Sequence, residues 1–374
     1  MGSHSHARRG GRTLSLTNKA IEQKTPMTEC IFPAICISFP QYCGGRRAAF
    51  YLAAEEYVAT CLPEGNYLFT WQIKPTVVIG RNQNAYAELD VDFCKQEGID
   101  IIRRKSGGGS IFANEGNVMT SLVTGKGAVE QLFREYADNV SASLRALGAE
   151  VEVSGRNDIV LVYDGVRGKI CGNAFYHLAN SNIVHGTMLY DTDLRMMKGA
   201  LTPQRAKLLS KGVKSVESRI ALLKDVLTEM TVAQLQEHIA TSLTNRTVHL
   251  TDEDISKIEE IERGYYDPSF LLGKHDYKDT SLQCRARIEG CGTVALAFAI
   301  ENGIVTSVTL EGDYFELGDA EKAFSEAFAT CPWSEHHLLE RIEEYQPYTT
   351  IRGMQKQDLV AMLNEYLKQE HNYD

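Results

Sequence analysis

The chain has 374 residues, with 39 Lys and Arg against 49 Asp and Glu, so its formal net charge at pH 7 is -10. This length predicts two domains, or three. The acidic balance argues against a nucleic-acid coat or a binder of anionic membranes, because both need basic surfaces. The nine cysteines are scattered without a Cys-x-x-Cys pair, which favours reduced intracellular thiols over a disulfide framework or a zinc ribbon. We therefore expect a cytoplasmic protein with no nucleic-acid or membrane partner.

Residues 1–27 are expected to form a disordered extension. They lack the apolar run of a secretory signal and hold Arg8, Arg9 and Arg12 with no acid before Glu22. The same composition resembles a transit peptide, so a mitochondrial location stays open as the alternative, as does Met27 as the true start. The sequence has no apolar stretch of about 18 residues and thus no predicted transmembrane helix.

The elements that follow alternate between helices and strands. Helical spacing of apolar residues predicts an amphipathic helix over Arg46–Cys61. β-Branched and aromatic runs predict strands at Tyr67–Gln72, at Thr76–Gly80 and from Ile101, two short strands in residues 111–125 and a three-strand meander in 151–191. Periodic apolar runs predict helices at Asp90–Gly98 and Val129–Leu147, a mainly helical stretch from Leu194 to Thr244 and a capped helix at Thr251–Arg263.

The character of the chain changes at a polar run, Lys274–Thr280. Beyond it lie three alternating strands and three helices: Leu282–Ile288, Val294–Ile300, Ile304–Leu310, Ala320–Thr330, Glu335–Glu344 and Gln355–Lys368. Glu301–Gly303 is a hairpin signal between two of these strands. We therefore place a boundary near residue 276 and predict an α+β fold, with one large domain over 28–276 and a small α+β domain over 277–374.

A triple-glycine loop is the strongest local signal for chemistry. Arg103, Arg104, Lys105 and Ser106 lead directly into Gly107–Gly109. Glycines let backbone N–H groups approach an anion closely, and the flanking cations would supply charge for a phosphate or a carboxylate. The alternative is a flexible surface turn with solvated charges. The loop is neither a Walker A motif nor a dinucleotide-binding GxGxxG.

A second signal is a lysine among glycines. Lys169 lies in the run GKICGNA, shortly after the run GRND that contains Asp158. Its ammonium could stabilise negative charge that develops beside an acyl phosphate. Asp158 could hold this lysine or help to bind a divalent metal carried by a nucleotide. Taken without context, an exposed surface charge and a turn residue remain the simpler interpretations.

The run VHGTML raises His185 as a base, a ligand or a buried structural imidazole. No second His or Cys stands at metal spacing nearby, so we expect no metal site built by a protein cluster. Cys171 has no obvious base beside it, so a small buried thiol is the better interpretation than a nucleophile.

Together these segments resemble the lipoate–protein ligases. The resemblance runs in order through WQIKPTVVIGRNQN, RRKSGGGSIFANEGN, GRNDI, GKICGNA, HGTMLYDTDL and SVESRI, and it covers Phe50 to about Ile220. The tail with AFAIENGIVTSVTLEGDYF is similar to the family's small accessory domain. The resemblance implies a mixed-sheet α+β catalytic domain, related to that of biotin ligases, and a small accessory domain.

The implied reaction has two steps. Lipoate and MgATP give lipoyl-AMP, and the lipoyl group then passes to a lysine of a lipoyl domain of a 2-oxoacid dehydrogenase subunit or of the glycine-cleavage carrier protein. By position, Lys169 and Asp158 would lie at the mixed anhydride, with Mg²⁺ carried by ATP near Asp158. The positions implied to bind substrate or nucleotide are Arg104, Ser106, Gly107, Gly108, Gly109, Asn117, Asn157, His185 and Thr187. Val78, Ile79 and Phe112 are expected to line an apolar acyl tunnel.

Some features depart from the family. Many members have His-Asp where this chain has Ala113 and Asn114, which leaves open the details of nucleotide contact and, as an alternative, a catalytically impaired lipoate-binding protein. A second alternative is an ATP-independent octanoyl or lipoyl transferase that uses a cysteine thioester. Biotin ligase is a third, although its Gly-Arg-Gly-Arg loop is replaced here by SGGG.

Overall fold

A computed structural model gives the fold and describes residues 34–155, 158–201, 220–271 and 282–370. All of these lie in one compact unit, Ile31–Asp374. The expected extension 1–27 and the expected boundary near residue 276 fall outside the described residues. In the part of the chain that is described, no helix is both long enough and apolar enough to cross a membrane.

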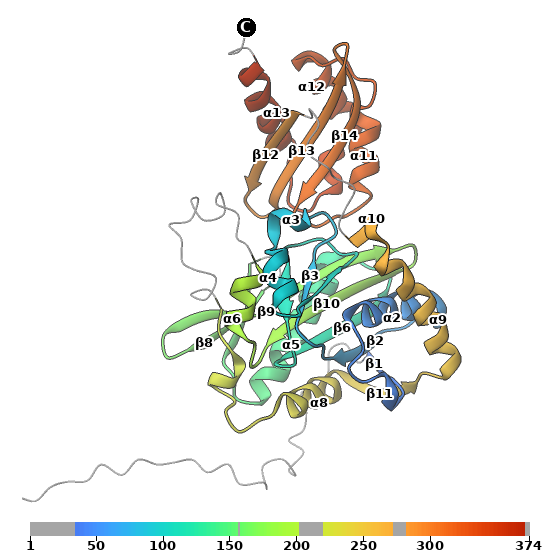
Figure 1. Cartoon of the computed structure of the whole chain (residues 1–374), viewed down its shortest axis with the longest axis vertical. Helices are drawn as coiled ribbons and strands as arrows, with labels where there is room; N and C mark the ends of the chain where they lie inside the picture. The colour runs from blue at the N-terminus through green and yellow to red at the C-terminus, as the bar shows by residue number, and fades with distance from the viewer. Residues whose placement is uncertain (1–33, 156–157, 202–219, 272–281, 371–374) are drawn as a thin grey trace, which may run out of the picture. The chain divides into compact units, whose positions relative to one another are not determined.

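The largest sheet has eight strands in the order β11-β1-β2-β6-β10-β9-β8-β7 (Figure 1). Its strand β1 runs parallel to both neighbours, whereas the other pairs are antiparallel, so the sheet is mixed. The bounds are Ala34–Ser38 (β1), Tyr67–Trp71 (β2), Asn117–Gly125 (β6), Val151–Ser154 (β7), Asp158–Tyr163 (β8), Val166–Leu178 (β9), Ser181–Leu189 (β10) and Thr244–His249 (β11). The expected meander is present, with its first strand divided into β7 and β8.

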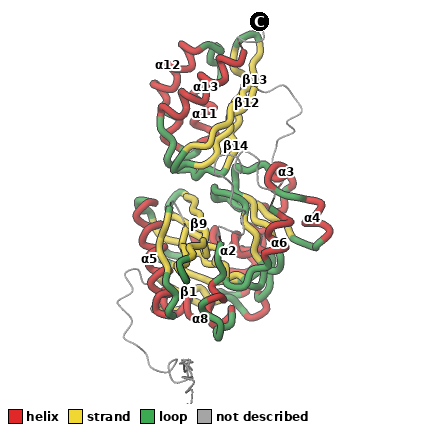
Figure 2. Tube along the Cα trace, turned by 90° about the vertical axis from the view of Figure 1, so that its left-hand side faces the viewer, coloured by secondary structure: helices red, strands yellow, loops and turns green. Residues whose placement is uncertain are grey.

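Helices cover both faces of this sheet. On one face, α2 (Ala48–Cys61) packs with α9 (Asp252–Glu262), and on the other face lie α5 (Val129–Ala146) and α8 (Val232–Leu243). In Figure 2, α2 and α5 lie on either side of the strands. Alternation along β2 explains the two cores, because Phe69 and Trp71 face α2 whereas Leu68 faces the opposite layer.

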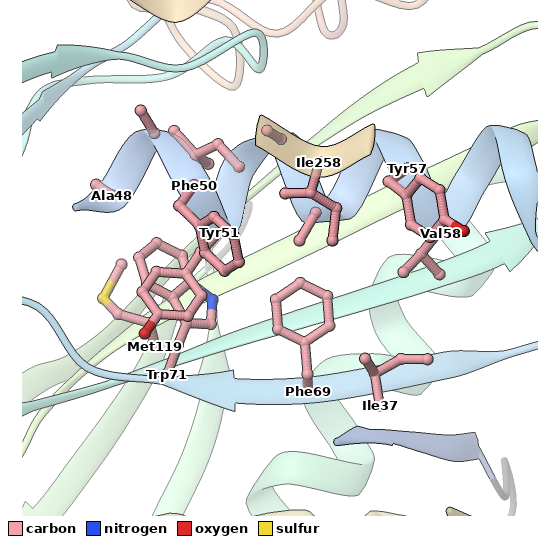
Figure 3. Packing of buried hydrophobic residues seen from close by; sticks show 14 of the residues in the cluster. Ile37, Ala48, Phe50, Tyr51, Tyr57, Val58, Phe69, Trp71, Met119 and Ile258 are labelled. Atoms are coloured by element: carbon pink, nitrogen blue, oxygen red, sulfur yellow. The ribbon is translucent and has the colours of Figure 1, made fainter. Parts of the chain in front are cut away.

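The expectation that α2 is amphipathic is wrong. Ten of its 14 residues are buried, because α9 covers the side of the helix that faces away from the sheet. Figure 3 shows Tyr51 above Trp71, Phe69 below the helix, and Ile258 of α9 beside it. The Tyr51 and Trp71 rings are stacked, with centroids 4.8 Å apart. A helix that is buried on nearly all sides leaves its one polar inner residue, Glu55, fully enclosed.

A second sheet carries the glycine loop. Its strands are β4 (Asp100–Arg103), β3 (Thr76–Ile79) and β5 (Ile111–Ala113), with β3 in the middle, parallel to β4 and antiparallel to β5. Three short helices, α3 (Ala85–Glu88), α4 (Val91–Gln96) and α6 (Leu194–Ala200), begin at side-chain caps and share a core with one face of this sheet. The triple-glycine segment connects β4 to β5.

A third sheet, β12-β13-β14, has its own core with α11, α12 and α13. The bounds are Leu282–Ile288 (β12), Gly292–Glu301 (β13), Ile304–Gly312 (β14), Ala320–Phe328 (α11), Glu335–Tyr345 (α12) and Lys356–Glu370 (α13). The expected hairpin between β13 and β14 is confirmed, since Asn302 and Gly303 both have positive φ, as a two-residue hairpin turn requires.

Some elements differ from expectation. The strands β1 and β11 and the short helices α3 and α10 (Pro268–Leu271) were not expected. Of the stretch expected to be mainly helical, the described part holds α6, a 3-10 turn at Leu223–Asp225 and α8, and it then ends in strand β11. Other 3-10 turns lie at Gln41–Cys43, Arg263–Tyr266 and Pro347–Thr350.

Candidate active site

A pocket opens where the glycine loop meets strands β9 and β10. It holds about 630 Å³ of empty space, part of it open to solvent. Its lining combines apolar side chains, loop backbone and a few polar groups: Leu52, Trp71, Val78, Arg104, Gly108, Gly109, Ser110, Ile111, Met119, Lys169, Gly172, Asn173, Ala174, His185, Gly186, Thr187 and Phe315. Such a lining suits a ligand that has a long apolar part and one charged end.

The cations on either side of Arg104 bond to groups of the protein. Nη1 of the Arg103 guanidinium donates to the carbonyls of Gly80, Arg81 and Gln83 at 2.7–3.0 Å, and Lys105 pairs with Glu56 at 2.7 Å. Burial lowers the pKa of Arg103 to about 10. Most of these contacts are with groups of the protein itself, although Nη2 of Arg103 is buried without a hydrogen-bond partner. The expectation that Arg103 and Lys105 supply charge to a bound anion stays a prediction.

Arg104 also bonds within the protein, but it reaches the pocket. Its guanidinium donates to the carbonyls of Val78, Gly107 and Gly109 at 3.1, 2.7 and 2.8 Å, and its Nε donates to the hydroxyl of Ser106 at 2.9 Å. Desolvation lowers its pKa to about 10. This single side chain therefore supplies hydrogen-bond donors to three backbone carbonyls. The glycines have no side chains that could do so.

Close packing explains two of the glycines near this loop. A Cβ on Gly80 would lie 1.9 Å from the carbonyl oxygen of Gly108, and a Cβ on Gly107 would lie 2.2 Å from that of Tyr314. Backbone atoms cannot yield to such overlaps. The loop is thus pressed between β3 on one side and residues from beyond β14 on the other.

A buried polar chain begins at the pocket lining with His185. Ser106 Oγ is 2.8 Å from Nε2 of His185, and Nδ1 of His185 is 3.0 and 3.1 Å from the two carboxylate oxygens of Glu55. Glu55 also accepts a bond of 2.6 Å from Ser121, whose oxygen accepts from the indole N–H of Trp71 at 2.9 Å. The predicted residues His185 and Ser106 are therefore in direct contact, and the other side of the His185 ring is bonded to a carboxylate that was not predicted.

Lys169 also lines the pocket. A bulge in the pairing of β8 with β9 sets Val160 opposite Lys169 but Ile159 opposite Cys171, and such a bulge re-aims the side chains beside it. The ammonium of Lys169 lies 2.7 Å from Oδ1 of Asp158, and each side chain is about one third exposed (37% and 33%). Thr187, on the neighbouring strand β10, also lines the pocket. The two residues expected at the reaction centre are therefore in contact.

Two predicted positions have other surroundings. Asn117 is buried, its Oδ1 accepts from the backbone N–H of Asn114 at 2.9 Å and its amide donates to the carbonyl of Met188 at 3.3 Å. It stabilises a turn and is not among the residues that line the pocket. Asn157 falls outside the described residues, as does most of the motif SVESRI.

The apolar lining was predicted only in part. Val78 lines the pocket, but Ile79 and Phe112 do not, because they point to the other face of the small sheet and pack with Val77. Strand alternation gives the reason, since Val77 pairs with Phe112 whereas Val78 pairs with Ile111. Leu52, Trp71, Ile111 and Met119 were missed as lining residues. Period-2 alternation of β5 against β3 would have indicated Ile111.

A residue from after β14 completes the pocket. Phe315 lines it and stacks on Phe175 of β9, with ring centroids 5.3 Å apart and an interplanar angle of 21°. The N–H of Gly108 donates to the carbonyl of Tyr314 at 3.1 Å. Arg352 donates to Glu130 at 2.6 Å and lies over the ring of Phe175. The segment after β14 therefore takes part in the site, which the sequence did not indicate.

Cys171 is a packing residue in the structure. It is 1% exposed and lies in the apolar cluster beneath the sheet. Burial raises the pKa of its thiol from 9.0 to about 12, which keeps it from forming the nucleophilic thiolate near neutral pH. This agrees with the expectation of a small buried thiol.

Comparison with known proteins identifies the family. Residues 47–244 match the family described as lipoyl protein ligase A/B catalytic domain, and residues 279–363 match the bacterial lipoate protein ligase C-terminus. The first match covers more than half of the chain. The chain belongs to the lipoyl protein ligase A/B family. The resemblance stated from the sequence motifs is therefore confirmed, and the two matches lie on either side of the expected boundary, which itself stays a prediction.

Curated relatives carry ligase names. Lipoate-protein ligase LplJ of Bacillus subtilis (strain 168) is 31% identical over 282 residues, which are 72% of this chain and 83% of that protein. Lipoate–protein ligase 1 of Staphylococcus aureus (strain Mu50) is 29% identical over 321 residues, 84% of this chain and 95% of that protein. The relatives are thus matched over most of their length.

Solved structures confirm the fold. P. falciparum LipL1, crystallised in complex with lipoate, has a TM-score of 0.70 at 17% identity, over 90% of this chain and 99% of that one. A bipartite lipoate protein ligase from Thermoplasma acidophilum has a TM-score of 0.57 at 23% identity, over 67% and 100%. A lipoate-protein ligase A bound with ATP has a TM-score of 0.54 at 22% identity, over 65% and 99%. The expected α+β class with mixed sheets and a small second α+β part is correct.

Proposed function

We propose that the chain is an ATP-dependent lipoate–protein ligase that makes lipoyl-AMP and transfers the lipoyl group to a lysine of a lipoyl domain. The observation that carries this is a pocket whose lining combines Lys169 with apolar side chains and the glycine loop. Family membership supports it, as do neighbours of the same fold whose structures contain lipoate or ATP, and one that was determined with its E2 lipoyl domain.

In the first step, a carboxylate oxygen of lipoate attacks the α-phosphorus of ATP, and the bond from that phosphorus to pyrophosphate breaks. The apolar residues Leu52, Trp71 and Met119 hold the acyl chain. The ammonium of Lys169 lies at the charged end and offsets negative charge shared by the carboxylate and the α-phosphate. Asp158 holds Lys169 in place through the 2.7 Å ion pair.

In the second step, the ε-amine of the acceptor lysine attacks the acyl carbon, and the bond to AMP breaks. Lipoyl domains of 2-oxoacid dehydrogenase subunits and the glycine-cleavage carrier protein are the acceptors we propose. Mg²⁺ enters with ATP, near Asp158. The described residues contain no group of three or more His, Cys, Asp or Glu that could hold a metal ion.

One experiment tests the function directly. The purified chain is mixed with lipoate, MgATP and an apo lipoyl domain, and the domain is weighed by mass spectrometry. A mass gain of one lipoyl group is expected, which requires ATP and is lost when the target lysine of the domain is changed to arginine. No gain with lipoate and ATP, but a gain from an octanoyl carrier protein without ATP, would replace the ligase by the transferase. The buried, protonated thiol of Cys171 already counts against that alternative.

A further inference from the structure

Two buried charges, Glu55 and Arg104, lie close to the pocket without bonding to each other. Glu55 is 0% exposed on α2, and Arg104 is 5% exposed before the glycine loop. A buried ion is costly unless opposite charge or hydrogen bonds compensate it. Ser106 and His185 lie between the two. The successive hydrogen bonds from Arg104 to Ser106, from Ser106 to His185 and from His185 to Glu55 are 2.8–3.1 Å long. The two charges are thus connected by two neutral hydrogen-bonding groups.

The donors and acceptors in this chain have one consistent direction. An arginine N–H can only donate, so Nε of Arg104 gives its hydrogen to the oxygen of Ser106. A Glu55 carboxylate can only accept, so Nδ1 of His185 donates to it. The Ser106 hydroxyl can either donate to Nε2 of His185 or accept from it, depending on the tautomer. We expect Ser106 to donate, because the direction from Arg104 to Glu55 is then uninterrupted and the imidazole carries its proton on Nδ1 alone.

The other end of the chain sets the glycine loop. Besides Ser106, Arg104 holds the carbonyls of Gly107 and Gly109 at 2.7 and 2.8 Å. In a trans peptide the C=O and the next N–H point in opposite directions. The N–H groups of Gly108 and Ser110 are therefore turned away from Arg104. Both of these residues line the pocket. By holding the carbonyls of Gly107 and Gly109, the guanidinium therefore sets the directions of the N–H groups of Gly108 and Ser110.

We propose that Glu55 is a positioning residue for the ligase reaction: through His185 and Ser106 it fixes Arg104, and through Arg104 it fixes the peptide orientations of Gly107–Gly109. This rests on the proposed function of the pocket. His185 is then a member of a fixed chain and not a general base, because its Nε2 already accepts from Ser106. Glu55 contacts neither substrate and acts only through its neighbours.

The test variant is Glu55→Gln, which keeps the size of the side chain and removes its charge. Glu56→Gln is the matched control. Glu56 is the next residue on α2 and also pairs with a cation, Lys105 at 2.7 Å, but neither of these two residues lines the pocket. Lipoate-dependent exchange of pyrophosphate into ATP gives kcat and KM, and thermal unfolding reports whether each variant is folded.

We expect Glu55→Gln to lower kcat for exchange by about 10- to 100-fold, because displaced reacting groups cost rate steeply. Its KM for ATP changes less than kcat, and Glu56→Gln stays close to wild type. Ser106→Ala breaks the chain at another point with the carboxylate intact, and it lowers kcat in the same way. It therefore decides the matter if Glu55→Gln does not fold. Unchanged kcat in Glu55→Gln or in Ser106→Ala overturns the proposal.

A second measurement does not depend on activity. The ¹⁵N chemical shifts of the His185 ring in the wild-type protein, identified by their loss in His185→Gln, report which nitrogen carries the proton. Nδ1–H with a bare Nε2 is expected. A proton on Nε2, or on both nitrogens, refutes the chain as described. If the wild-type protein makes no lipoyl-AMP at all, the proposed function fails while this tautomer still tests the buried chain.

Discussion

Replacing Lys169 by methionine separates catalysis from stability. Methionine keeps much of the stem and removes the ammonium. The lost ion pair with Asp158 is about one third exposed on both sides, so the free energy of unfolding should fall by about 1 kcal/mol or less. The rate of lipoyl-AMP formation should fall much further. Removing one preorganised group that stabilises transition-state charge costs about 2.7–4 kcal/mol, or roughly 10²- to 10³-fold in kcat.

The same strand offers a matched control. Arg167 pairs with Glu152 at 2.6 Å, with side chains 56% and 50% exposed, and it does not line the pocket. Pyrophosphate release and urea unfolding are measured for Lys169→Met, Arg167→Met and the wild type. Arg167→Met should be close to wild type in both assays. The reasoning fails if Lys169→Met releases pyrophosphate within about threefold of the control, since about threefold corresponds to well under 1 kcal/mol of transition-state stabilisation.

Two further predictions concern packing and pH. Gly80→Ala places a methyl group 1.9 Å from the carbonyl oxygen of Gly108, whereas Gly109→Ala has open space around its Cβ. Urea unfolding should show a loss of about 1–3 kcal/mol for Gly80→Ala and little change for Gly109→Ala; equal losses would contradict the close approach. Burial raises the pKa of Cys171 from 9.0 to about 12, so above pH 9 the unfolded chain loses this proton first. Stability should therefore fall from pH 9 towards 12, with a slope of up to about 1.4 kcal/mol per pH unit. The slope should be smaller in Cys171→Ala, and an identical slope would show that the thiol is not held protonated.

Local patterns predicted most strands and helices, and failed where pairing is distant. The alternation in Ile304–Leu310 and the turn at Asn302 and Gly303 are local signals, and the hairpin is present. Strand β11 has no such signal, because it lies at the edge of the sheet and its residues are exposed or half-buried. It forms by parallel pairing with β1, which is some 200 residues earlier in the chain. A window along the sequence cannot detect that contact.

The candidate site divides in the same way. The glycine-containing runs GKICGNA and VHGTML are local signals, and they contain Lys169, His185 and Thr187. The structure places all three residues on the pocket wall. Glu55 lies on a helix that was expected to be amphipathic, and it bonds to a residue 130 positions away. Helical periodicity gave one usable signal, because Glu55 lies three positions after Leu52 and therefore shares the face that meets the sheet.

The glycine loop shows why arginine is used where an anion-binding cation was expected. Three consecutive glycines have no side chains to satisfy buried carbonyls, and each unsatisfied carbonyl would be costly. Arg104 supplies several N–H donors in one rigid plane and holds three carbonyls and a hydroxyl at once, which a lysine with a single compact ammonium cannot do. Its charge is offset through Ser106 and His185 by Glu55. Of the two cations that line the pocket, Arg104 is therefore committed to the loop. Lys169 is held by one carboxylate that is about one third exposed, so we propose its ammonium as the one that meets a reacting phosphate.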